Sequence, residues 1–154
     1  MQTAYKKIEI QIKTTRGMTV PSYATPGSAA VDLRAAIEEG EELVIQPGAK
    51  ALVPTGLAIA PKTDDVVAIV AARSGLAVKH GVCLSNGIGV IDSDYRGEIC
   101  VGLYNTSDVP FIIRRGDRIA QLMFVPVMQA AFIQTDELDE TERGTGGFGS
   151  TGVK

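Results

Sequence analysis

Short apolar segments separated by turn residues run along most of the chain. Ile8, Ile10 and Ile12 alternate with polar residues, and this period of two predicts a half-buried strand. Residues 66–72 and 119–128 are longer apolar runs, which predict buried strands. Further strands are expected at residues 43–45, at 49–60 with an interruption at Pro54, at 99–103 and at 111–113.

These segments recur about every 8–12 residues, which is the spacing of an all-β sandwich or barrel. The one helix candidate is short, residues 75–80, and reads equally well as a loop. A length of 154 residues fits one domain. The pattern therefore predicts a single all-β domain.

The character of the chain changes after residue 135. Residues 136–142 hold five carboxylates, and residues 143–152 hold five glycines. A segment this polar and this rich in glycine cannot build a core. We therefore divide the chain into a β domain, residues 1–135, and a flexible C-terminal arm, residues 136–154.

Composition excludes several classes of function. A net charge of −3 argues against a broad basic surface for nucleic acid. One histidine, His80, and two cysteines, Cys83 and Cys100, argue against a zinc centre, and a single histidine excludes catalysis by several histidines. We expect both thiols to be reduced core residues. No apolar run approaches the ~18 residues of a membrane span, and no targeting stretch is visible at the start. These features favour a cytoplasmic or nuclear protein that binds neither nucleic acid nor a membrane.

The arm contains the spacing G-x-G-x-x-G at Gly144, Gly146 and Gly149. No helix can follow in the few remaining residues, so we reject a dinucleotide-binding turn. Backbone N–H groups of glycines can still approach an anion, and Arg143, Ser150 and Thr151 add donors. Phe148, an isolated aromatic among glycines, favours a lid that closes over a planar ligand, although a disordered linker end is the plain alternative.

Two other segments carry candidate chemistry. Arg73, Ser74 and Gly75 follow an apolar strand and offer a guanidinium, a hydroxyl and an unhindered N–H, which suit a phosphate chain. In residues 89–98, Asp92 directly follows two apolar residues, so we expect it to be partly desolvated and to act as a base. An ordinary turn and a solvated hairpin are the respective alternatives.

Five motifs, taken together, resemble those of the trimeric deoxyuridine triphosphate nucleotidohydrolases (dUTPases). They occur in the family's order at residues 29–35, 72–77, 89–98, 115–122 and 143–152, and so span nearly the whole chain. Two departures are minor: Ala30-Val31 stands where the family has Gly-Tyr or Gly-Leu, and Ala72 stands where it has proline. Neither removes a reacting group.

The resemblance implies a jelly-roll-like β-sandwich or barrel and a homotrimer whose active sites are shared. One subunit would give the uracil-binding hairpin, a second the Arg-Ser-Gly segment, and a third its arm. The implied reaction is Mg²⁺-assisted hydrolysis of dUTP to dUMP and pyrophosphate. It would keep uracil out of DNA and supply dUMP for thymidylate synthesis.

The resemblance also implies roles for single residues. Asp92 would be the general base, Tyr95 would exclude ribose, Phe148 would stack on uracil, and Asp32 would hold Mg²⁺ through water while substrate phosphates carry the metal. The uracil hairpin would use Asn86, Gly89, Val90 and Ile91. The phosphates would be held by Arg73, Ser74, Gly75, Gln121, Arg143, Gly149, Ser150 and Thr151.

Three other functions remain open from the residues. A dCTP deaminase, or its bifunctional deaminase–dUTPase form, would need a differently built hairpin, and residues 92–98 fit a dUTPase better. A β-sandwich binding protein that had lost activity would not explain the intact Arg73, Asp92 and Gln121. A capsid-type jelly roll would not explain the glycine-rich arm.

Overall fold

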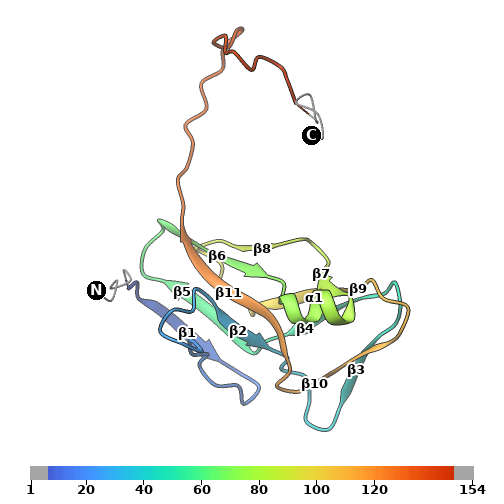
Figure 1. The fold of residues 1–154 in the computed structure, drawn as a ribbon. Helices are drawn as coiled ribbons and strands as arrows, with labels where there is room; N and C mark the ends of the chain where they lie inside the picture. Colours follow the sequence, from blue (N-terminus) through green and yellow to red (C-terminus); the bar gives the residue numbers. More distant parts are fainter. Residues whose placement is uncertain (1–6, 148–154) are drawn as a thin grey trace.

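The chain folds into a β-sandwich with one short helix. The structure is a computed structural model that describes residues 7–147. Within that range it contains eleven strands and one helix, α1 (Figure 1). The predicted all-β class is confirmed.

The strands form four antiparallel sheets. In the largest, β2 (Val31–Arg34), β11 (Arg118–Pro126), β6 (Val66–Ala71) and β8 (Gly89–Ile91) lie in that order. A three-stranded sheet has the order β4 (Lys50–Pro54), β9 (Cys100–Asn105) and β7 (Val82–Leu84). Two further pairs join β1 (Ile10–Thr14) to β5 (Leu57–Pro61), and β10 (Phe111–Arg114) to β3 (Glu42–Ile45).

One hydrophobic core joins all four sheets. Each sheet contributes side chains that alternate inward with a period of two, as half-buried strands require. The contributions include Leu33 and Leu122, Val53 and Leu103, Ile45 and Ile113, and Ile59. The alternation leaves the outward face of β2, β11 and β6 free to carry polar groups.

Most predicted strands are confirmed, with some shifts in their bounds. The segment 49–60 divides into β4 and β5 at Thr55 and Gly56, just after the expected interruption. Gly56 has a φ of +68°, and a Cβ there would lie 2.7 Å from the Cγ of Met18. Only glycine therefore permits this turn without displacing its neighbours. The first strand starts at Ile10 and not at Ile8.

Three short strands, β2, β7 and β8, were not predicted. The four residues of β2 and the three each of β7 and β8 are too few to show a periodicity.

The sequence left residues 75–80 as either a short helix or a loop, and the structure shows a helix. α1 (Ser74–His80) begins after a gap of two residues beyond the end of β6 and is capped by Gly81, which adopts a left-handed conformation with φ of 65°. The single backbone N–H of Gly81 is directed at the carbonyls of Ala77 and Leu76, as at many helix ends. The Arg-Ser-Gly segment is thus a strand-to-helix junction.

The chain leaves the sandwich after Pro126. Residues 127–147, here called the extended segment, contain neither helix nor strand and run away from the body (Figure 1). Met128, Phe132 and Ile133 are 96%, 96% and 87% exposed. The departure precedes the expected boundary at residue 135, and the division into domain and arm stays a prediction.

Cys83 and Cys100 are both free thiols. Cys83 on β7 is half-buried, but Cys100 on β9 is exposed, so the expectation that both are core residues is wrong. The side chain of Cys100 belongs to the outward set of its strand, which places it toward solvent. Among residues 7–147, no helix combines the length and the apolar character needed to cross a membrane.

Candidate functional site

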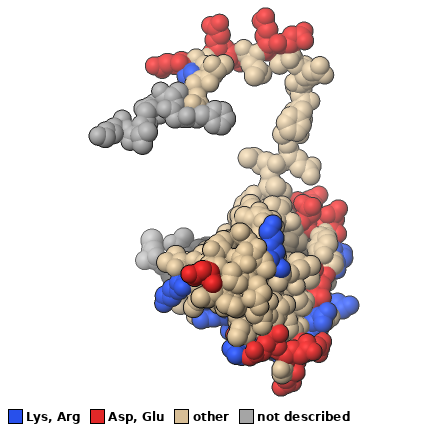
Figure 2. Space-filling model, turned by 90° about the vertical axis from the view of Figure 1, so that its right-hand side faces the viewer, with Lys and Arg blue, Asp and Glu red and all other residues tan. Residues whose placement is uncertain are grey.

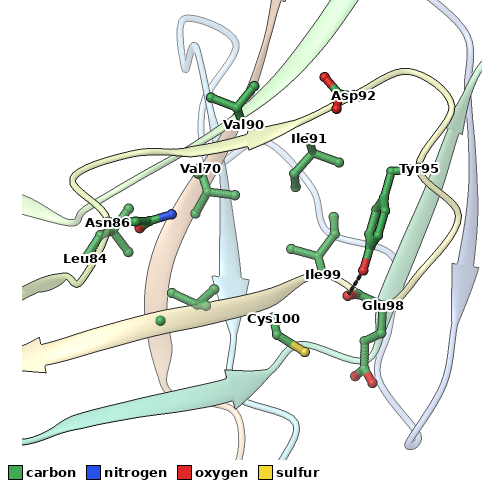
Figure 3. Close-up of a pocket in the computed structure, with 13 residues that line it drawn as sticks. Val70, Leu84, Asn86, Val90, Ile91, Asp92, Tyr95, Glu98, Ile99 and Cys100 are labelled. Carbon is green, nitrogen blue, oxygen red and sulfur yellow. Dashed lines mark hydrogen bonds between the residues drawn. The ribbon is translucent and has the colours of Figure 1, made fainter.

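A pocket lies between the hairpin of β8 and the start of β9. It has a volume of about 240 Å³ and a floor of apolar side chains that includes Val70 and Leu84. Figure 3 shows Asn86 at one end of it and Tyr95 at the other, with Asp92 at the rim. Polar groups therefore stand at both ends of a cavity with apolar side chains between them, a composition found in small-molecule sites.

Glycine allows the hairpin to lie close to β6. Val70 and Gly89 are register partners, and a Cβ at Gly89 would lie 3.0 Å from the Cβ of Val70. Gly87 turns the chain with a φ of +75° just before it. The expected tight turn between Asn86 and Ile91 is thus present, and its backbone lines the pocket.

Asp92 follows β8 at the edge of the largest sheet. Its backbone carbonyl accepts the N–H of Tyr95 at 3.2 Å, which closes a turn. The Asp92 side chain is exposed, and within residues 7–147 no hydrogen bond or ion pair holds its carboxylate. The expected partial desolvation is wrong for a single copy, because β8 is an edge strand and nothing among residues 7–147 covers the turn.

Tyr95 is held against the backbone that follows it. Its hydroxyl donates to the carbonyl of Glu98 at 3.1 Å (Figure 3). The Glu98 carboxylate in turn accepts the N–H of Gly56 at 2.7 Å and Nε of Arg16 at 3.3 Å. The wall of the pocket is therefore tied to the turn between β4 and β5.

A second group of site residues lies on the outward face of β2, β11 and β6. Gln121 is the register partner of both Asp32 and Ala71, so these three positions share one face. Arg73 follows Ala71 by two residues, and Ser74 and Gly75 then open α1 in exposed positions. The structure thus brings together four of the eight residues expected to hold phosphates.

Asp32 is clamped between two guanidinium groups. Its Oδ1 lies 3.1 Å from Nε of Arg73, and its Oδ2 lies 3.3 Å from Nη1 of Arg118. Nη1 of Arg73 also donates to the carbonyl of Arg118 at 3.0 Å. Both Arg73 and Arg118 line a second cavity of about 280 Å³. The Asp32 carboxylate therefore holds the guanidinium groups of both Arg73 and Arg118 at the lining of this cavity.

The described residues offer little to a protein-held metal. Between residues 7 and 147 there is no cluster of three or more metal-ligating side chains. Asp32 is the predicted ligand, and two of the roughly four acceptor positions of a carboxylate face the guanidiniums. Oδ1 is buried beside Arg73 and makes no hydrogen bond with any described residue, so Oδ2 is the oxygen left to accept a hydrogen bond from a metal-bound water. This donor set fits Mg²⁺ carried by substrate phosphates and does not fit an all-protein cage.

The two groups of residues lie apart within one copy. The two cavities have no lining residue in common. Ile91 pairs with Ala68, whereas Arg73 lies beyond Ala71 at the far end of β6. At about 3.3 Å per residue, Ala68 and Ala71 alone are separated by about 10 Å. The family resemblance implies that the hairpin and the Arg-Ser-Gly segment of one site come from different subunits, and within one copy the two groups lie apart.

Arg143 belongs to the extended segment, which leaves the body of the sandwich (Figure 1), and it lines neither cavity. Its Nε donates to the carbonyl of Gly146 at 2.8 Å, a local contact only. The remaining predicted arm residues lie outside the described range: Phe148, Gly149, Ser150 and Thr151.

Sequence reasoning missed three residues that the structure adds to the site. Arg118 joins Asp32, Gly97 lies under the ring of Tyr95, and Cys100 lines the first cavity. Burial raises the pKa of the Cys100 thiol, Glu98 raises it further, and Arg16 lowers it. Arg118 and Gly97 lie within the motifs at residues 115–122 and 89–98. Their spacing in the sequence does not show that Arg118 pairs with Asp32 or that Gly97 packs against Tyr95.

Comparison with known proteins gives a consistent result. The family profile described as dUTPase matches residues 16–152. A deoxyuridine 5'-triphosphate nucleotidohydrolase of Desulfitobacterium hafniense is 54% identical over 142 residues, which cover 92% of this chain and 93% of that protein. The protein of the same name from Shewanella halifaxensis is 51% identical over 150 residues, covering 96% and 97%.

Solved structures agree in fold. The Staphylococcus bacteriophage 80alpha dUTPase with dUPNHPP superposes with a TM-score of 0.83 at 26% identity, covering 94% of this chain and 99% of that chain. A mutant dUTPase from phage phi11 of S. aureus, described for its coordination of a structural Mg(II) ion, has a TM-score of 0.74 at 21% identity and covers 86% and 99%.

Proposed function

The chain belongs to the dUTPase family, and from this premise we propose that it hydrolyses dUTP to dUMP and pyrophosphate at sites shared between copies of the chain. The observation that carries this proposal is the division of the site. A base-sized cavity with a carboxylate at its rim lies on one part of the surface, and a cationic face suited to phosphates lies on another.

The first cavity supports recognition of uracil. The amide of Asn86 and the backbone of the hairpin can complement the O4 and N3 edge of the base. Cytosine reverses this donor and acceptor pattern, and each buried group left unpaired costs about 1–3 kcal/mol. The close approach of Gly89 to Val70 leaves little room for the methyl group of thymine. Tyr95, at the other end, would pack against the sugar and exclude a 2′-hydroxyl.

Two copies are needed to bring the uracil cavity to the phosphate face. We propose a homotrimer in which the hairpin of one copy meets the face around Arg73 of a second. The C-terminal arm of a third copy would close the site, with Phe148 stacked on the base. The extended segment supports this arrangement, because apolar side chains as exposed as Met128 and Phe132 normally lie against a partner.

The chemistry assigned to the chain's own residues is simple. Asp92 orients a water molecule and accepts its proton at the carboxylate. The water oxygen forms a bond to the α-phosphorus as the bond from that phosphorus to the α,β-bridging oxygen breaks. Pyrophosphate leaves with that electron pair, and no covalent intermediate forms. Asp92 is exposed in a single copy, and contact with the second copy together with closure by the arm of the third would remove it from bulk water.

The phosphates would be positioned by the polar face around Arg73 and by the C-terminal arm. The second copy would contribute Arg73, Ser74, Gly75 and Gln121. The arm of the third copy would contribute Arg143, Gly149, Ser150 and Thr151. Asp32 keeps Arg73 in place and would accept a water bound to Mg²⁺. When bound to the phosphates, Mg²⁺ would lower the negative charge that the attacking water meets.

The reaction would have two uses in the cell. It would lower the concentration of dUTP, so that uracil is not built into DNA. Its product dUMP would serve thymidylate synthesis.

The test is pyrophosphate release from dUTP, dCTP, dTTP and UTP, each with and without Mg²⁺. We expect release from dUTP alone, with strong dependence on Mg²⁺, and no ammonia from dCTP. Ammonia release would indicate a deaminase, and binding of dUTP without turnover would indicate a binding protein. The mass of the assembly in solution, measured in the same buffer, tests the trimer.

A further inference from the structure

We propose that Gly97 determines the sugar specificity of this enzyme because its lack of a side chain allows the ring of Tyr95 to pack directly against the backbone. Gly97 would be a positioning residue, since it acts through Tyr95 and does not itself touch the nucleotide. The inference rests on the proposed function, in which Tyr95 stands against the 2′ position of the sugar.

The space above Gly97 is filled by the tyrosine ring. A Cβ built at residue 97 would lie 2.3 Å from the hydroxyl oxygen of Tyr95 and 2.5 Å from Cζ. Atoms do not approach this closely, so an alanine at 97 and the observed ring position exclude each other. The backbone of Gly97 is not in the left-handed region, so alanine itself causes no backbone strain there.

The ring, and not the backbone, must then give way. Tyr95 is 46% exposed, so its ring has space on the solvent side into which it can be displaced once its hydrogen bond to Glu98 is broken. The backbone after Gly97 is fixed: the N–H of Ile99 donates to the carbonyl of Leu57 at 2.7 Å, and the Ile99 carbonyl accepts from Thr55. The Glu98 carboxylate adds its bonds to Gly56 and Arg16. Residues 98 and 99, which directly follow Gly97, are therefore anchored to β5 and to the turn between β4 and β5.

Displacement of the ring would open one end of the cavity. In the observed position the hydroxyl of Tyr95 is tethered to the Glu98 carbonyl, and the ring forms a stationary wall (Figure 3). A wall that is free to rotate no longer excludes one additional hydroxyl group. We expect Gly97→Ala to reduce the preference for dUTP over UTP by about tenfold or more, which is the discrimination that one close contact supplies.

The experiment is a double-mutant cycle on that preference. The ratio of kcat/KM for dUTP to kcat/KM for UTP is measured for the wild type, Gly97→Ala, Tyr95→Ala and the double variant. Tyr95→Phe keeps the ring and loses only its hydrogen bond. Gly27→Ala is the matched control, because nothing lies within 4 Å of a Cβ at that position.

The expected result is a reduced ratio in Gly97→Ala and in Tyr95→Ala, with no further reduction in the double variant. Tyr95→Phe should lower the ratio less, and Gly27→Ala should not change it. An unchanged ratio in Gly97→Ala, or reductions that simply add in the double variant, would overturn the inference. Thermal unfolding of Gly97→Ala well below that of the wild type would also overturn it, because the backbone and not the ring would then have yielded.

Failure of the proposed function is recognised separately. If the wild type releases no pyrophosphate from dUTP, or treats dUTP and UTP alike, the proposed function fails before any variant is compared. If the wild type discriminates and Gly97→Ala discriminates equally well, only the role of Gly97 fails.

Discussion

Two inactive chains should restore each other's activity when they assemble together. One chain carries Asp92→Asn, which removes the base at the first cavity. The other carries Arg73→Gln, which removes a cation from the phosphate face. Within one copy these two residues line different cavities. Asp92 follows Ile91, the register partner of Ala68, and Arg73 lies beyond Ala71, which is itself about 10 Å from Ala68 along β6.

The size of the recovery follows from that separation. In a cyclic trimer assembled at random from equal amounts, a site is intact when each of two neighbouring positions holds the suitable chain. The probability is about one half at each position, so about one quarter of the sites are intact. If both residues served one site within a copy, no site would be intact at any mixing ratio.

The assay is dUTP hydrolysis after the two variants are unfolded together and refolded as a mixture. A matched control mixes the wild type with a chain that carries both substitutions. That control should retain about one quarter of the wild-type activity if the site is shared and about one half if it is not. A mixture of the two single variants that stays inactive, while the control retains one half, would refute the shared site.

Four further outcomes follow from the structure. Asp92→Asn should bind a dUTP analogue with little change in Kd and lose turnover; wild-type turnover would remove Asp92 as the base. A chain that stops after Glu142 should fold and assemble but lose activity, and undiminished activity would contradict closure by the arm. Asn105→Ala should lower the free energy of unfolding by about 2–4 kcal/mol in urea titration, because two carbonyls, bonded at 2.9 and 2.7 Å to the buried amide, lose their donor; a loss below about 0.5 kcal/mol would contradict this. In a Cys83→Ser background, iodoacetamide at pH 8 should label Cys100 more slowly than in the unfolded chain, since burial and Glu98 raise its pKa, and dUMP should slow labelling further. Equal rates would contradict the placement of Cys100 in the cavity.

The fold could be predicted to the extent that it depends on local pattern. β6 and β11 are long apolar runs, and both are identifiable without knowing what they pair with. The pairing of β2 with β11 joins segments far apart in the chain and leaves no mark in either of them. For the same reason the sequence cannot show that β8 is an edge strand, which is why Asp92 is more exposed than expected.

The candidate site shows the same division. Residue types predict chemistry well, since a guanidinium, a hydroxyl and a glycine after a strand do lie together at the end of β6. Contacts between side chains require the tertiary structure. The ion pair between Asp32 and Arg118 and the packing of the Tyr95 ring against Gly97 depend on the tertiary structure. The spacing of these residues along the sequence predicts neither contact.

The acidic residues of the extended segment would affect how copies of the chain behave before they assemble. A newly made copy exposes apolar side chains such as Phe132, Ile133 and Leu138, which would attract any other unassembled chain. Carboxylates between residues 136 and 142 stand directly beside them, as Figure 2 shows in red. Like charges flanking an apolar stretch repel nonspecific contacts of this kind. The acidic run would thus keep free copies in solution until correct partners are found, and neutralising it should increase aggregation at high chain concentration without changing the activity of complexes already formed.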